Sequence, residues 1–205
     1  MFHAKKSFIE KVLFSNILRT KNRNHKIAYA ALMTALVVVA NMFFEFKFMD
    51  VQFSFTIAVS ALTGLVLGPL LGFAACFVGD LVGFLYNSGG YPYMPWVGLS
   101  MALTAVFAGV AYNLFERNTT RKSVVIGVVV SLLSFVVCTV LINTTAFWLL
   151  YSPKTPYWVY LTARLLGKGQ IYNCLVNYVL IIIGAPMVEK LLYKSNHAEE
   201  SAEKE

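Results

Sequence analysis

The amino-acid sequence predicts an all-α integral membrane protein with six transmembrane helices and both termini in the cytoplasm. The composition is 58% hydrophobic and 13% charged, whereas soluble proteins carry about 25% charged residues. The apolar residues form long runs, and the charged residues gather between these runs. A soluble protein is excluded because a single core could not hide so much apolar surface from water.

Each predicted span is an apolar run close to the roughly 20 residues that a helix needs to cross the hydrocarbon core. Gly68-Pro69 separates the second run from the third and predicts a tight turn at the membrane edge. The last two runs are longer than needed, so we expect helices that are tilted, extended beyond the bilayer or broken. The six predicted spans are 27–44, 52–67, 70–87, 96–115, 123–150 and 160–192.

The polar ends of the chain set the predicted orientation. Residues 1–26 carry seven basic residues and no signal-peptide cleavage pattern, so we interpret them as a retained cytoplasmic segment. Residues 193–205 form an acidic tail, which we expect to be solvated. With six spans, thirteen of the 17 Lys and Arg residues fall on the side of the termini. The positive-inside rule places that side in the cytoplasm.

Catalytic and metal-binding motifs are missing from the sequence. There is no HExxH, GxSxG or P-loop pattern, so we predict no enzyme activity, no metal and no cofactor, and any active transport must take its energy from a partner. The net charge of +7 follows the flanks of the membrane segments, and no nucleic-acid partner is predicted. The histidines lie in the polar ends and the cysteines in apolar runs, at His3, His25, His197, Cys76, Cys138 and Cys174.

Asp80 is a carboxyl group deep in the third predicted span, within Gly79-Asp80-Leu-Val-Gly83. An ionisable group in hydrocarbon is costly, so it is a candidate ligand-binding residue. The alternative is a structural hydrogen bond to Ser, Asn or Tyr on a neighbouring helix. The sequence leaves both open.

Other polar and aromatic residues gather toward the predicted outer ends of the spans, as in a ligand pocket open to the outside. The alternative for the aromatic residues is an interfacial belt, and for Thr144 and Thr145 a bond within their own helix. We expect Gln170, Asn173 and Asn177 to hold helices together. The candidate substrate-binding residues here are Gln52, Ser54, Tyr91, Tyr93, Trp96, Asn143 and Trp148.

Arg164 and Lys168 are spaced to stack on one face of the last predicted helix. Two cations with no acid within four residues predict an anion-binding feature. Snorkelling to the outer headgroups is the alternative.

Small residues recur at four-residue spacing in the first two spans. Ala31 and Ala35 lie on one face of the first, and Ser60, Gly64 and Gly68 repeat in the second. Such faces allow close helix approach, either inside the protein or to another subunit.

Taken in order, these features resemble the S component of an energy-coupling factor (ECF) vitamin transporter of the folate-transporter-like group. The resemblance covers about residues 27–192. It is carried by Ala31 and Ala35, Gly68-Pro69-Leu-Leu-Gly72, Gly79-Asp80-Leu-Val-Gly83, Asn87-Ser-Gly-Gly-Tyr-Pro, Asn143-Thr144 before Trp148, and Ala163-Arg164 with Lys168.

The resemblance implies a subunit of the bacterial plasma membrane that captures a water-soluble vitamin, folate first, from outside the cell. It implies docking through Ala31 and Ala35 onto a membrane coupling (T) subunit, with two cytoplasmic ATPases driving uptake. Two alternatives stay open. One is an S component for pantothenate, cobalamin, pyridoxine or a precursor, and the other is a structural membrane protein that does not transport.

Overall fold

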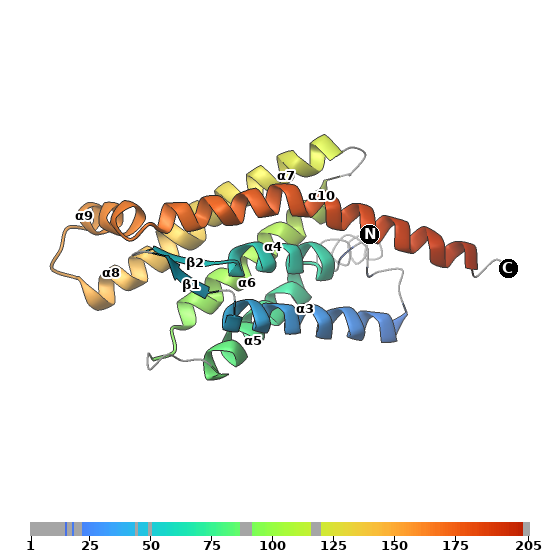
Figure 1. The fold of residues 1–205 in the computed structure, drawn as a ribbon, viewed down its shortest axis with the longest axis horizontal. Helices are drawn as coiled ribbons and strands as arrows, with labels where there is room; N and C mark the ends of the chain where they lie inside the picture. Colours follow the sequence, from blue (N-terminus) through green and yellow to red (C-terminus); the bar gives the residue numbers. More distant parts are fainter. Residues whose placement is uncertain are drawn as a thin grey trace, which may run out of the picture.

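The computed structural model describes residues 15, 18, 22–43, 45–48, 51–86, 92–115 and 120–202, and it describes side chains outside 45–48, 51–52 and 192–202. The chain folds into a helical bundle with one small β-hairpin (Figure 1). Its elements are α3 (Arg23–Phe43), β1 (Glu45–Phe48), β2 (Val51–Ser54), α4 (Thr56–Leu67), α5 (Pro69–Tyr86), α6 (Pro95–Leu114), α7 (Thr120–Leu133), the π-helix η1 (Ser134–Thr144), α8 (Thr145–Tyr151), α9 (Tyr157–Thr162), the π-helix η2 (Ala163–Gly167) and α10 (Gln170–Ala202).

Five helical segments within the described residues are long and apolar enough to cross a membrane, and α4 is a shorter apolar helix. The predicted span 52–67 is therefore wrong as a continuous helix. Residues 51–54 instead pair antiparallel with 45–48, with Lys47 opposite Gln52 and Glu45 opposite Ser54. The remaining 12 residues of α4 rise about 18 Å, less than the roughly 30 Å of hydrocarbon.

The two longest predicted spans behave differently from each other. Helices α7, η1 and α8 follow one another without a break over Thr120–Tyr151. The predicted span 160–192 is broken, because η2 ends in a turn at Lys168 and α10 begins after Gly169, whose φ is 63°. A positive φ is a conformation that glycine adopts without steric cost.

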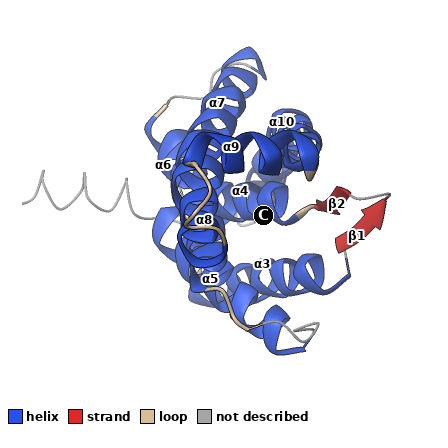
Figure 2. Cartoon of the chain, turned by 90° about the vertical axis from the view of Figure 1, so that its left-hand side faces the viewer, coloured by secondary structure: helices blue, strands red, loops and turns tan. Residues whose placement is uncertain are grey.

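The hairpin, α8 and α9 gather at one end of the bundle, whereas α3 begins and α10 ends at the other (Figure 1). Strand β1 contacts α3, and β2 contacts α10, so the hairpin lies between these two helices (Figure 2). Helix α4 lies between α3 and α10 in both views (Figures 1 and 2).

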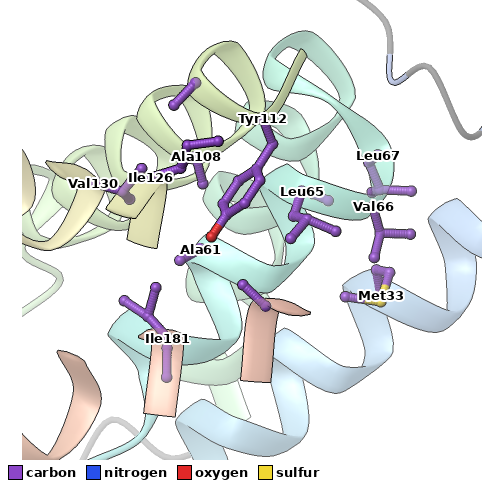
Figure 3. Packing of buried hydrophobic residues seen from close by; sticks show 14 of the residues in the cluster. Met33, Ala61, Leu65, Val66, Leu67, Ala108, Tyr112, Ile126, Val130 and Ile181 are labelled. Carbon is purple, nitrogen blue, oxygen red and sulfur yellow. The ribbon is translucent and has the colours of Figure 1, made fainter. Parts of the chain in front are cut away.

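The hydrophobic core lies where α3, α4, α6, α7 and α10 meet. Tyr112 of α6 is 1% exposed and points among these helices (Figure 3). Its hydroxyl donates to the Ser123 carbonyl at 3.2 Å. The apolar residues around it include Met33, Leu65, Ile126, Val130 and Ile181.

Helices α4 and α6 approach closely at a glycine. A Cβ added to Gly64 would collide with the backbone of Ala105. The small-residue stripe of the second predicted span therefore packs inside the protein. Gly68 closes the tight turn predicted between α4 and α5, with a φ of 83° and its N–H donating to the Gly64 carbonyl at 2.8 Å.

Candidate ligand-binding site

A cavity of about 220 Å³ opens among the segments near the hairpin end of the bundle. Helices α3, α4, α6 and α10, strand β2 and the segments η1, α8 and η2 all contribute side chains to it. The lining residues are Asn41, Ser54, Thr56, Ile57, Val97, Ser100, Met101, Thr104, Ser134, Cys138, Thr139, Asn143, Phe147, Arg164, Gln170 and Asn173.

Three of these lining residues bury a polar atom that has no hydrogen-bond partner among the described residues. The atoms are the Ser134 hydroxyl, Asn143 Oδ1 and Arg164 Nε. Buried polar atoms in proteins are nearly always hydrogen-bonded, and an unpaired one costs about 1–3 kcal/mol. Three unpaired atoms around one cavity indicate a place where a bound molecule completes the hydrogen bonds.

Arg164 gives the cavity a positive charge. Its guanidinium carbon lies 4.2 Å from the ring centroid of Phe147, which is cation–π geometry. The Tyr160 phenol interacts with the same guanidinium. No Asp or Glu lines the cavity in the described part of the chain. The charge of Arg164 is therefore available to an anionic or carbonyl group of a ligand.

Lys168 does not accompany Arg164 into the cavity. It is exposed and is not among the lining residues. The predicted stacking assumed an α-helix, but Arg164 lies in the π-helix η2, and the Lys168 N–H donates to the Ala163 carbonyl five residues earlier at 3.0 Å. η2 ends at Gly167 and Lys168 lies in the turn that follows, so the two cations do not stack on one continuous helix face as predicted.

Asp80 lies beside the cavity without lining it. It is 6% exposed, and its Oδ1 accepts a bond from Asn41 Nδ2 at 2.9 Å. Its Oδ2 accepts a bond from the Tyr93 hydroxyl at 3.1 Å. Burial raises the pKa of Tyr93 to about 12, and Asp80 acts in the same direction. The phenol therefore stays protonated at neutral pH. These partners match the structural alternative for Asp80, and Asn41 is the member of the network that reaches the cavity.

Ser54 lines the cavity and ties the hairpin to α10. Its N–H donates to Asn173 Oδ1 at 2.9 Å, and its carbonyl accepts from Asn177 Nδ2 at 2.6 Å. Asn177 thus joins segments as expected, while Asn173 both joins them and lines the cavity. Gln52 pairs with Lys47 in the hairpin, and its side chain lies outside the described residues.

The two candidate tryptophans lie next to the cavity. The Trp96 ring stands edge-on to Phe147, with centroids 5.8 Å apart, and its Nε1 is buried without a partner among the described residues. Trp148 Nε1 donates to the Thr155 carbonyl at 2.7 Å, so this side chain holds the α8–α9 connection. Neither lines the cavity, and Tyr91 lies outside the described residues.

Sequence reasoning missed several lining residues. Asn41 left a signal, because it is a lone amide in the apolar run of α3. Phe147 left none beyond its place beside Trp148. The remaining missed residues include Ser100, Thr104, Ser134, Thr139 and Gln170, most of them hydroxyls that a helix can also satisfy through its own carbonyls.

Comparison with known families identifies the kind of membrane protein to which this helical bundle and its cavity belong. The family profile described as "ECF-type riboflavin transporter, S component" matches residues 21–194. The chain belongs to this family. It is accordingly a substrate-binding component of an ECF transporter and not an enzyme.

One solved structure supports the same fold for this S component. Its title is "Crystal structure of FolT bound with folic acid", and it matches with a TM-score of 0.58 and 23% identity. The match covers 77% of this chain and 87% of that chain. The search of the curated proteins found no match. The resemblance drawn from the sequence to an ECF vitamin-transporter S component is confirmed.

Proposed function

We propose that this S component captures folate from outside the cell for ATP-driven uptake. The observation that carries the proposal is the set of unpaired buried atoms at Ser134, Asn143 and Arg164 around one cavity. A ligand that supplies a carboxylate and several polar edges would satisfy them. Folate has two carboxylates and a flat heteroaromatic ring with amino and carbonyl groups.

The charge of the cavity supports an anionic ligand. Arg164 is a planar donor that pairs with carboxylates through two parallel hydrogen bonds, and no acid lines the cavity within the described residues. Ile57, Val97 and Met101 supply apolar walls for a ring. A volume of about 220 Å³ is below the roughly 300–1,000 Å³ of most ligand sites. We therefore infer that the cavity widens as folate enters.

Riboflavin is the second candidate, because the matching family profile carries its name. Riboflavin has a flat ring system but no ionised group at neutral pH, so it would leave the Arg164 charge unmatched. The charge of the cavity favours folate over riboflavin.

The test is to identify and titrate the ligand. The protein is purified from cells grown in rich medium, and the bound molecule is identified by mass spectrometry. Emptied protein is then titrated with folate and with riboflavin. We expect folate to be recovered and to bind more tightly. Recovery of riboflavin, or tighter binding of riboflavin, would contradict the folate assignment. Binding of neither would contradict a vitamin site.

We also propose that Ala31 and Ala35 form the docking face for a membrane coupling (T) subunit, which two cytoplasmic ATPases drive. Both alanines are exposed on α3, beside Leu32 and Leu36, at 64% and 39% exposure. Small side chains allow a partner helix to approach closely. We place both termini in the cytoplasm, following the distribution of Lys and Arg, and the chain in the bacterial plasma membrane, following its family.

The docking test separates binding from transport. Replacing Ala31 and Ala35 together by Leu should abolish vitamin uptake in cells and leave binding by the isolated protein unchanged. The matched control replaces Val125 and Val129, an exposed pair at the same spacing on α7, by Leu and should preserve uptake. Equal loss of binding and uptake in the alanine variant would show that this face is needed for the fold instead.

A further inference from the structure

The Asn41 side chain connects the cavity to a buried carboxyl group. Asn41 lines the cavity, and its Nδ2 donates to Asp80 Oδ1 at 2.9 Å. Asp80 itself is 6% exposed and is absent from the lining. The buried carboxyl group therefore reaches the cavity through this amide.

Three segments hold the Asp80 carboxyl group in place. It extends from α5 to Asn41 on α3, and its second oxygen accepts from the Tyr93 hydroxyl at 3.1 Å. The backbone of α6 is close as well, because a Cβ added to Gly98 would lie 2.5 Å from Asp80 Oδ2. Tyr93 in turn packs against Phe84 at 5.1 Å between ring centroids. The carboxyl group has little freedom to turn.

This arrangement fixes which atom of the Asn41 amide faces away from Asp80. An amide carries its NH₂ group and its oxygen on opposite sides of one carbon. Because the NH₂ group donates to Asp80 Oδ1, the oxygen points away from the carboxyl group. No other hydrogen bond of Asn41 is found among the described residues. Asn41 therefore keeps its amide oxygen, an acceptor, and one second N–H for a ligand in the cavity.

A hydrogen-bond donor is found where α9 leads through η2 into α10. Arg164, in η2, is a donor only and lines the same cavity. Helices α3 and α10 lie on opposite sides of α4 (Figures 1 and 2). The cavity thus has an acceptor contributed by α3 and a cationic donor contributed by η2.

We propose that Asp80 is a positioning residue that fixes the Asn41 oxygen as an acceptor, so that the ligand binds with an N–H donor toward Asn41 and a carboxylate toward Arg164. This orientation rests on the proposed function. For folate, the amino group and ring N–H of the pterin would face Asn41, and the glutamate end would face Arg164.

A double-mutant cycle on folate affinity tests the positioning role. Asp80→Asn keeps the size of the side chain but can present either oxygen or NH₂ to Asn41, so the orientation of the amide is no longer fixed. Asn41→Ala removes the acceptor. We expect each variant to weaken folate binding about tenfold and the double variant to weaken it by the same tenfold. Independent contributions would instead multiply to about a hundredfold.

Ser131→Ala is the control. It removes a buried hydrogen bond, from the Ser131 hydroxyl to the Gly127 carbonyl at 2.8 Å, that lies outside the cavity lining, so folate affinity should change by less than about threefold. A loss equal to that of Asp80→Asn would overturn the proposal, because affinity would then fall with any buried hydrogen bond that is removed. A multiplicative cycle would overturn it as well.

A change in the ligand tests the proposed orientation without any substitution at Asp80. A folic acid analogue that lacks the pterin amino group should bind wild type about tenfold more weakly than folate binds wild type. In Asn41→Ala, the analogue and folate should have equal affinities. An unchanged preference for folate in Asn41→Ala would overturn the orientation.

These outcomes separate the orientation from the proposed function. Folate binding with a multiplicative cycle overturns the orientation alone. If riboflavin binds and folate does not, the folate assignment and the orientation of a carboxylate toward Arg164 both fail, and the same cycle run with riboflavin shows whether Asp80 still positions Asn41. Binding of neither vitamin to wild type overturns both.

Discussion

The two ends of the helical bundle use the same helices in opposite ways. Toward the turn between α4 and α5, small residues bring backbones into contact, as at Gly64 with Ala105 and at Gly109 with Pro69. Toward the hairpin end, α4, α6 and α10 instead present hydroxyl and amide groups to a cavity. Outside the cavity lining, the hydroxyl groups of Ser60, Ser123 and Tyr178 are also buried without a partner among the described residues, but a hydroxyl group is cheap to bury compared with a guanidinium.

This difference shows that the role of a residue depends on its position along the helix as well as on its type. The packed end holds the helices at fixed separations. At the cavity end, polar atoms stay unpaired, which lowers the stability of the empty protein and leaves hydrogen-bonding groups for a ligand. Natural sites commonly combine such local cost with function.

The largest effect is expected at the packed end. Gly64→Ala places a Cβ against the Ala105 backbone, which cannot move as a flexible side chain would. We expect a loss of about 3 kcal/mol or more of stability, measured by thermal unfolding in detergent. Gly167→Ala is the control, because an added Cβ there meets nothing within 4 Å. Equal stability of the two variants would contradict the close contact between α4 and α6.

A medium effect on binding is expected at Asn143. Asn143→Leu removes an amide whose Oδ1 is buried without a partner among the described residues. Folate affinity should fall about tenfold, while the unfolding temperature of the empty protein stays the same or rises. Titration calorimetry and thermal unfolding measure the two quantities. A large loss of stability with unchanged affinity would show that Asn143 belongs to the packing instead.

The smallest effect is expected from pH. No His, Asp or Glu lines the cavity in the described part of the chain, and the pKa of Tyr93 is raised to about 12. Folate affinity should therefore change less than about twofold between about pH 6 and pH 7.5, below the range in which the pterin ring N–H of folate itself ionises. A tyrosine whose pKa is raised on folding stabilises the protein below its ordinary pKa of about 10. That stability declines as pH rises from about 10 toward 12. A steep change near pH 7 would contradict this expectation, because it would require a group at the cavity that titrates there.

The sequence predicted the membrane bundle because apolar run length is a direct physical requirement of the hydrocarbon core. It failed at residues 52–55, where an apolar and alternating segment serves a strand as well as a helix. Partners decide such cases, and here β2 pairs with β1. In the last predicted span, backbone hydrogen bonds determine where the helix breaks. The π-helical turn at Arg164 and the break at Gly169 leave no signal in the pattern of hydrophobic residues.

The site was predicted in part for a related reason. A charged or amide residue in an apolar run is visible in the sequence, so Arg164 and Asn143 were found. Which neighbour turns inward depends on helix rotation, so Phe147 lines the cavity where Trp148 was expected. Asp80 was visible as well, but only the structure gives its partners Asn41 and Tyr93.

We propose that the Arg164 charge at this cavity binds the ligand carboxylate. Isothermal titration of folate into wild type, Arg164→Ala and Lys168→Ala tests it most directly, because Lys168 is an exposed cation four residues away. A charge-assisted hydrogen bond is worth about 1.5–3 kcal/mol, so Arg164→Ala should weaken binding about ten- to a hundredfold. Arg164→Lys should be intermediate, and Lys168→Ala should bind as wild type does. Unchanged affinity in a folded Arg164→Ala protein would show that the ligand carboxylate is recognised elsewhere.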